Sequence, residues 1–409
     1  MISLMSDIRI ATRNLRRNTK RTLVAVLTVS GGVIAFLLAG GFIDWTLLNM
    51  REDTIHSQLG HIQIVRPNYF EKGIADPYRF LLPSNAQEQS IVATTPGLRT
   101  LSSRLAFSGL LSLDEGTVPF IGEGIDPELE RPISSRINII AGQDLRDRKE
   151  RAILLGEGLA KSIGAKTGDT VVLLATTANG SANAVEVVVA GVFSTSSKEF
   201  DDNALRLPLD IAHKLMRVDG ATSWVVLLDD TSKTKSAVDY LSASLPPGKF
   251  EIVPWDNLAD FYNKTAVLFS RQVEVVKLII GLIVILTISN TQTMSVLERT
   301  TEIGTSLAIG LRNRVILQIF LLEGVLIGLA GGILGIGLGY LLATLISAVG
   351  IPMPAPPGMA HGYTGEILIS IPIALDAIAL ALTTTLLASI MPAWRASRMN
   401  IVDALRCNQ

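Results

Sequence analysis

The sequence predicts an integral membrane α-helical protein. Four transmembrane helices are arranged one plus three, with a large mixed α/β extracytoplasmic domain inserted between helices 1 and 2. Three observations predict this fold class. Four apolar runs are each long enough to cross a bilayer, the stretch between the first two has the composition of a soluble domain, and cations gather on one side of the runs.

Composition sets the first bound on function. The 409-residue chain is 48% hydrophobic and has a formal net charge of −1. Such a balance indicates neither a nucleic acid partner nor a strongly acidic substrate.

Residues 1–21 are expected to form a cytoplasmic amphipathic helix on the inner membrane face. Six cations stand here against the single acid Asp7. Ile8, Ala11 and Leu15 share one face, and arginines lie on the other. A solvated basic face is the simpler alternative.

Residues 22–49 form the first predicted span. The uncharged run over residues 22–43 exceeds the core of a typical signal peptide, although "LAGG" at residues 38–41 leaves cleavage as an alternative. Gly31, Ala35 and Ala39 recur every four residues, which predicts close helix packing within the subunit or across a dimer.

Residues 50–272 are predicted to form the extracytoplasmic domain, which is long enough for two subdomains. Strand-like runs such as "VEVVVAGVF" alternate with helical patterns such as "RAILLGEGLAKSIG". Two pairs of neighbouring carboxylates are assigned to surface turns rather than to an active site. They are Asp201 with Asp202 and Asp229 with Asp230.

No motif in the chain predicts catalysis or metal binding. The histidines lack metal-ligand spacing, the only cysteine is Cys407, and the glycine-containing residues 156–164 do not fit a phosphate-binding loop. We therefore expect a non-catalytic chain with no metal and no cofactor of its own.

Three further spans are predicted at residues 273–297, 315–346 and 367–394, with an outer loop at 347–366. Glu323 interrupts the third span. Snorkelling or a partner within the bundle is favoured over a proton pathway. The third span also carries two glycine ridges at four-residue spacing, which predict close helix packing. They are Gly324, Gly328 and Gly332, and Gly331, Gly335 and Gly339.

Cation counts give the orientation. The basic residues 1–21 and the arginines of the tail at 395–409 flank the membrane on one side, whereas the outer loop has no Lys or Arg. The positive-inside rule therefore places both termini in the cytoplasm. The large domain is then extracytoplasmic.

Two segments carry a family resemblance. "VLERTTEIGTSLAIGLRNRVI" at residues 296–316 and "PAWRASRMNIVDALR" at residues 392–406 are similar to the signatures of the macrolide-exporter and lipoprotein-releasing permeases of ABC transporters. "RNLRRNTKRTLVAVL" at residues 13–27 and much of the soluble region also resemble this family. Ile401 stands where the family usually has proline.

The resemblance implies that residues 298–314 hold a coupling helix that docks on a separate ABC ATPase. Ile303, Leu307, Gly304 and Ala308 would form its compact face, although an ordinary solvated turn is the alternative. Charged side chains would pair around the ATPase groove. The expected contact residues are Glu298, Arg299, Glu302, Ile303, Gly304, Leu307, Ala308 and Gly310.

The implied working unit has two ATPases, which bind ATP and Mg, and a second permease that is identical or different. The implied function is mechanotransmission: ATP hydrolysis drives a conformational change outside the cytoplasm and extracts a lipoprotein or amphiphile from the inner membrane. A periplasmic lipoprotein carrier or a membrane-fusion protein would then be a partner, beside the membrane lipids. The alternatives are macrolide or peptide efflux in a tripartite pump, and a non-transporting coupler that activates an extracytoplasmic hydrolase.

Overall fold

The computed structural model describes residues 2–73, 76–84, 87–355 and 362–399. Cys407, Ile401 and the rest of the predicted tail beyond Met399 lie outside these ranges. The chain divides into two compact units. The first comprises Met1–Leu47, Ala266–Pro352 and Thr364–Gln409, and the second comprises Leu48–Thr265 and Met353–Tyr363.

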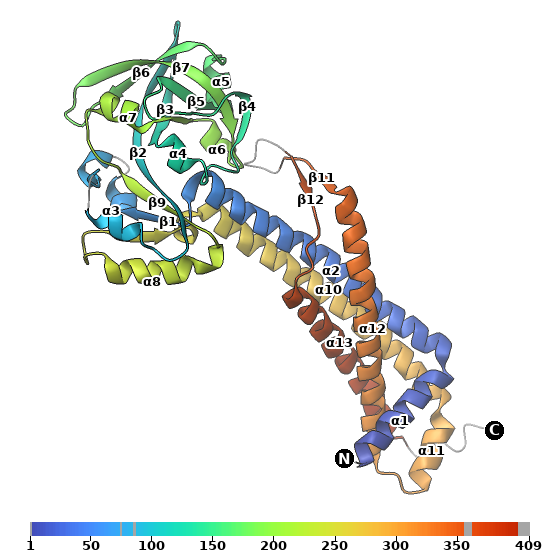
Figure 1. Cartoon of the computed structure of the whole chain (residues 1–409). Helices are drawn as coiled ribbons and strands as arrows, with labels where there is room; N and C mark the ends of the chain where they lie inside the picture. The colour runs from blue at the N-terminus through green and yellow to red at the C-terminus, as the bar shows by residue number, and fades with distance from the viewer. Residues whose placement is uncertain (1, 74–75, 85–86, 356–361, 400–409) are drawn as a thin grey trace. The chain divides into compact units, whose positions relative to one another are not determined.

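The first unit is a helical bundle (Figure 1). Within the described residues, four helices are long and apolar enough to cross a membrane, which confirms the one-plus-three layout. Each runs past the roughly 20 residues that a hydrocarbon core requires. The helices of the bundle are α1 (Ile2–Arg17), α2 (Thr19–Thr54), α10 (Asp260–Glu298), α11 (Thr300–Ala308), α12 (Asn313–Val349) and α13 (Ile371–Ser397).

The two glycine ridges of α12 face different neighbours. A Cβ built on Gly328 would lie 2.4 Å from Thr385 Oγ1 of α13, and one on Gly335 would lie 2.7 Å from Val33 of α2. Helix backbones approach this closely only where a side chain is missing. The ridge of Gly324, Gly328 and Gly332 therefore faces α13, and the ridge of Gly331, Gly335 and Gly339 faces α2.

The small residues of α2 behave differently. Gly31 and Ala35 are exposed, Ala39 is half-buried, and nothing lies within 4 Å of a Cβ built on Gly31. Gly31 therefore does not pack against another helix of the described chain, and the prediction of packing within the subunit is wrong at this residue. The alternative, a contact across a dimer, stays a prediction.

The second unit is built on a ten-stranded sheet with the order β10-β1-β9-β2-β3-β8-β5-β7-β4, and β6 pairs with β2 and β7. The strands are β1 (Ile62–Val65), β2 (Leu98–Leu113), β3 (Gly116–Ile125), β4 (Asn138–Gly142), β5 (Ala152–Gly156), β6 (Thr170–Thr176), β7 (Ala182–Ser194), β8 (Ala204–Pro208), β9 (Ser223–Leu228) and β10 (Glu251–Pro254). A short ladder joins β11 (Ile351–Met353) to β12 (Tyr363–Gly365).

Strand β2 belongs to two hydrophobic cores. Its first part, residues 98–104, pairs with β9, and its second part, residues 105–113, pairs with β3. Helices α5 (Glu157–Ile163) and α7 (Leu209–Met216) pack on the larger core, and α8 (Thr234–Ser244) packs on the smaller one. The remaining short helices are α3 (Gln87–Val92), α4 (Pro127–Glu130), α6 (Lys198–Asp201) and α9 (Trp255–Leu258), with η1 (Ile55–Leu59), η2 (Tyr69–Gly73), η3 (Pro77–Phe80) and η4 (Thr231–Lys233).

One of the carboxylate assignments is wrong. Asp201 is buried, not on a surface turn, and it accepts hydrogen bonds from Thr195 N at 2.9 Å, Thr195 Oγ1 at 2.8 Å and Ser194 Oγ at 3.1 Å. Burial raises its pKa. Asp202 is half-buried, Asp229 and Asp230 are exposed, and Asp230 caps η4 by accepting from Ser232 N at 2.8 Å. Asp201 therefore orders the chain between β7 and α6.

Candidate functional site

The predicted coupling helix is α11, which lies between α10 and α12 in the chain. Its apolar residues Ile303, Gly304 and Leu307 are buried. Ile303 and Leu307 pack in a cluster with side chains of three other helices. These are Val296 of α10, Ile316 and Phe320 of α12, and Ala393 and Ala396 of α13.

This burial corrects the expected ATPase-contacting face. Ile303 and Leu307 hold α11 against its own bundle, and Gly304 is buried with them, so this face is not exposed to a partner protein. Helical spacing identified an apolar stripe correctly, but the stripe is covered from within the chain. Ala308 is exposed and lies off the stripe.

The acids beside α11 also have partners within the chain. Arg17 Nη2 donates to both oxygens of Glu302 at 2.7 Å, and Arg21 donates to Glu298. The hydrogen bonds from Arg17 hold the pKa of Glu302 below its usual value. Both acids therefore tie α11 and the end of α10 to the basic N-terminal segment, instead of standing free for a partner protein.

Arg299 points inward. Its Nη1 lies 3.1 Å from Glu323 Oε1 of α12, and its guanidinium carbon lies 5.5 Å from the centre of the Phe320 ring. Asn14 Nδ2 of α1 donates to the same Glu323 oxygen at 2.9 Å. Glu323 thus has two partners in the bundle. Asn14, Arg299 and Glu323 help to line a pocket of about 30 Å³, which has room for about two water molecules.

The exposed part of this region is residues 308–314, which we call the tip. Ile309 is 81% exposed and Leu311 is 42% exposed. Gly310 lies between them with φ +102°, a positive-φ conformation that ends α11 and that glycine adopts without strain. Sequence reasoning selected Ala308 and Gly310 but missed Ile309 and Leu311. Two apolar residues flanking a helix-ending glycine were the available signal.

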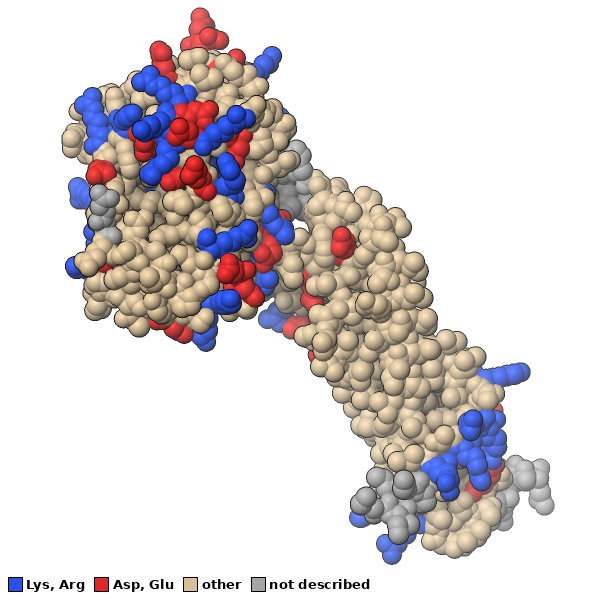
Figure 2. Space-filling model, viewed as in Figure 1, with Lys and Arg blue, Asp and Glu red and all other residues tan. Residues whose placement is uncertain are grey.

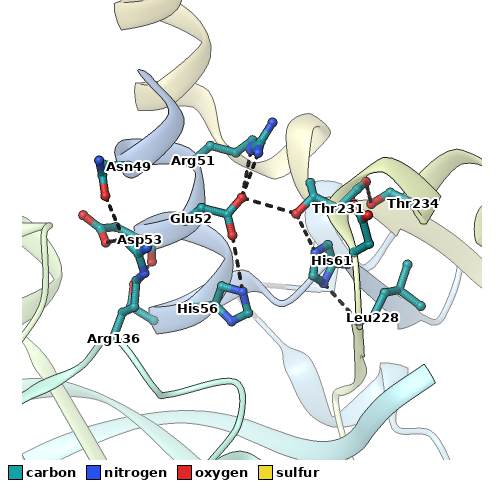
Figure 3. A network of polar contacts seen from close by, with 12 residues as sticks. Asn49, Arg51, Glu52, Asp53, His56, His61, Arg136, Leu228, Thr231 and Thr234 are labelled. Atoms are coloured by element: carbon teal, nitrogen blue, oxygen red, sulfur yellow. Dashed lines mark hydrogen bonds and ion pairs between the residues drawn. The ribbon is translucent and has the colours of Figure 1, made fainter. Parts of the chain in front are cut away.

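A second polar network surrounds the last turn of α2, within the α/β unit (Figure 3). Glu52 lies at its centre, 2.9 Å from Arg51 and 3.5 Å from His56 Nε2. Thr231 Oγ1 donates to Glu52 at 3.3 Å. Nearby, Arg136 contacts Asp53 at 2.6 Å. The last turn of α2 is thereby fixed on two sides.

His61 completes this network. Leu228 N donates to its Nδ1 at 3.0 Å, so the neutral ring carries its proton on Nε2, which lies 3.0 Å from Thr231 Oγ1. Burial lowers the pKa of His61 to about 4. The neutral imidazole of His61 therefore links Leu228 of β9 to Glu52 through the Thr231 hydroxyl.

A buried ionic cluster lies next to the same helix end. Arg206 Nε lies 3.0 Å from Glu123, and Arg104 pairs with Glu130. Both arginines also donate to backbone carbonyls of η1, at Ser57 for Arg206 and Gln58 for Arg104. Buried charges need partners of opposite charge, because their desolvation is costly. The cluster anchors η1 to the sheet.

The fold and these two regions define a polytopic membrane protein with spans in a one-plus-three order and an inserted α/β domain. Residues 275–401 match the FtsX-like permease C-terminal model, and residues 22–244 match the MacB-like periplasmic core domain. The chain belongs to this MacB-like family of ABC transporter permeases.

Three relatives illustrate the similarity. An uncharacterized ABC transporter permease of Methanocaldococcus jannaschii is 26% identical, over 66% of this chain and 66% of its own length. The lipoprotein-releasing system transmembrane protein LolC of Xylella fastidiosa is 25% identical, over 70% of this chain and 73% of its own. The macrolide export ATP-binding/permease protein MacB of Escherichia coli O157:H7 is 35% identical, over 40% of this chain, which spans only 24% of that protein.

Proposed function

We propose that this chain is the non-catalytic permease subunit of an ABC transporter and converts ATP hydrolysis by a separate ATPase into movement of its extracytoplasmic domain. One observation carries the proposal: α11 is packed firmly against three spans, and the exposed tip follows it directly. A push on the tip would therefore reach α10, α12 and α13 without first deforming α11.

The route to the α/β unit supports the same function. The boundary between the two units falls inside α2 and α10, which are each continuous across it. The polar network around Glu52 then fixes the last turn of α2 to the domain. A displaced helix would carry the domain with it.

The proposed assembly contains two ATPase copies, which bind ATP and Mg, and a second permease. We place the ATPase contact at the tip, with Ile309 and Leu311 added to the Ala308 and Gly310 expected from the sequence. Glu298, Arg299 and Glu302 act indirectly, by holding α11 in place.

The proposed orientation has both termini in the cytoplasm, in a bacterial inner membrane. A single cysteine at Thr305 and another at Ser181, each in a Cys407→Ser background, test it, since both positions are exposed. An impermeant thiol reagent added to cells with a permeabilised outer envelope should label Ser181→Cys and spare Thr305→Cys. Equal labelling would refute the topology.

The proposed cargo is a lipoprotein or another membrane-embedded amphiphile. Similarity to LolC over 70% of the chain favours it, together with the lipoprotein-releasing resemblance of the soluble segments. Similarity to MacB supports macrolide efflux as the second candidate. Depletion should leave acylated proteins in the inner membrane on fractionation. Normal lipoprotein distribution combined with macrolide hypersensitivity would favour efflux instead.

The coupling proposal is tested at the tip. Ile309→Ser and Leu311→Ser remove exposed apolar surface, so the permease should be present in normal amounts but should fail to co-purify with its ATPase or to stimulate it. The matched control is Ile121→Ser, because Ile121 is 57% exposed on the extracytoplasmic domain. If the tip variants assemble and hydrolyse ATP like the control, the tip is not the ATPase contact.

A further inference from the structure

Helix α1 carries a row of arginines with no acidic partner among the described residues. Arg9, Arg13 and Arg16 are spaced by four and three residues, so they share one face, and all three are exposed. Arg17 and Arg21, by contrast, are paired with Glu302 and Glu298. Figure 2 shows basic side chains gathered at the end of the bundle where α1 and α11 lie. We call Arg9, Arg13 and Arg16 the arginine row.

The contacts made by the opposite face of α1 show which way the arginine row points. Asp7 and Ala11 are buried there, and Asn14 donates to Glu323 of α12. At about 100° per residue, the arginine row lies on the other side of the helix from these contacts. Its guanidinium groups therefore point away from the bundle.

The depth of the arginine row relative to the membrane follows from the contact between Asn14 and Glu323. Glu323 lies about 15 Å along α12 from its first residue, so α1 lies beside α12 and not beyond its end. The remainder of α12, from Glu323 to Val349, is about 39 Å long, which is enough to cross a hydrocarbon core of about 30 Å. Helix α1 therefore lies at the edge of that core, where lipid phosphates are found.

We propose that the arginine row binds the phosphates of anionic phospholipids and fixes α1 at the membrane surface. Guanidinium groups bind phosphate oxygens through paired hydrogen bonds. Ile8 and Ile10 flank the row and are 38% and 41% exposed, which suits the boundary between headgroups and acyl chains. Because Arg17 of the same helix holds Glu302, lipid binding by α1 also positions α11.

The probe is phosphatidylglycerol, compared with phosphatidylcholine, on the purified full-length chain. Native mass spectrometry would measure how many lipids remain bound and how tightly. The test variant combines Arg9→Gln, Arg13→Gln and Arg16→Gln. A control with the same charge change combines Lys214→Gln, Lys235→Gln and Lys249→Gln on the extracytoplasmic domain, where all three lysines are exposed.

The wild type and the lysine control should prefer phosphatidylglycerol, and the arginine variant should lose this preference. Each surface cation contributes about a fivefold gain in affinity, so removing three should lower affinity on the order of 100-fold, and less at high salt. Replacing the three arginines with lysine should restore most of the binding, which distinguishes lost charge from misfolding.

Unchanged phosphatidylglycerol preference in a folded arginine variant would overturn the proposal. If that variant instead lost its ATPase during co-purification, the row would be an ATPase contact, and the lipid proposal would also be refuted. The lipid measurement needs no ATPase, so its result is independent of the coupling test at the tip.

Discussion

Arg17 and Glu302 lie 285 positions apart in the sequence, yet both carboxylate oxygens of Glu302 accept from one nitrogen of Arg17 at 2.7 Å. The pair joins α1 to α11. Its side chains are 54% and 50% exposed, so it contributes little to global stability. Its effect is positional, because it decides where α1 lies relative to the helix that precedes the tip.

Glu302→Lys should therefore loosen α1 with little change in overall stability. Two like charges would face each other, and amide hydrogen exchange in α1 should accelerate, while the free energy of unfolding changes by about 1 kcal/mol or less. The double variant Arg17→Glu with Glu302→Arg should restore slow exchange. Equal exchange in Glu302→Lys and the wild type would show that the pair does not hold α1.

The close contact between α12 and α2 predicts a sharp contrast between two nearby glycines. A Cβ at Gly335 would meet Val33 at 2.7 Å and the Ser30 carbonyl oxygen at 3.0 Å, whereas Gly337 has nothing within 4 Å. Gly335→Ala should destabilise the bundle by about 1–3 kcal/mol. Gly337→Ala should be neutral or stabilising by up to about 1 kcal/mol. Denaturant unfolding in detergent compares them, and equal effects would contradict the predicted packing.

The inward pair of Arg299 and Glu323 predicts strong coupling between two substitutions. The side chains of Arg299 and Glu323 are 13% and 6% exposed, so either Arg299→Ala or Glu323→Ala leaves the other residue's charge buried without its partner. Each single substitution should lower the free energy of unfolding by about 2–4 kcal/mol. The double variant should cost clearly less than the sum of the two. A double-mutant cycle on unfolding free energies measures this, and additive costs would mean that the two charges do not interact.

The lowered pKa of His61 predicts acid sensitivity where α2 joins the domain. The unfolded histidine has a pKa near 6.5 and the folded one about 4, so the unfolded state binds more protons between these values. Stability is complete above about pH 6.5 and falls as the pH drops towards 4, by up to on the order of 2–3 kcal/mol.

Hydrogen exchange at the Leu228 amide, corrected for its intrinsic pH dependence, reports this loss directly. His61→Gln can still accept from Leu228 and donate to Thr231, but it does not titrate in this range. Its exchange should therefore lack the pH-dependent component. A pH profile shared by the variant and the wild type would assign the effect to another group.

Hydropathy and charge were enough to predict the spans and the inserted domain, because burial in lipid imposes long apolar helices. The glycine ridges of α12 likewise predicted close packing. Periodicity could not say what covers an apolar face, so Ile303 and Leu307 were assigned to a partner protein although they pack on their own bundle. The pairs of Arg17 with Glu302 and of Arg299 with Glu323 depend on tertiary proximity, which no local pattern encodes.

The shared strand β2 limits how the extracytoplasmic domain can deform. Pulling its two cores apart would break the ladder of β2 with β9 or with β3, and each lost backbone hydrogen bond would leave unpaired polar groups. A change in the twist of β2 keeps both ladders intact, since strands tolerate a range of twist. We therefore expect this domain to deform most easily by twisting about β2, so that one core rotates relative to the other.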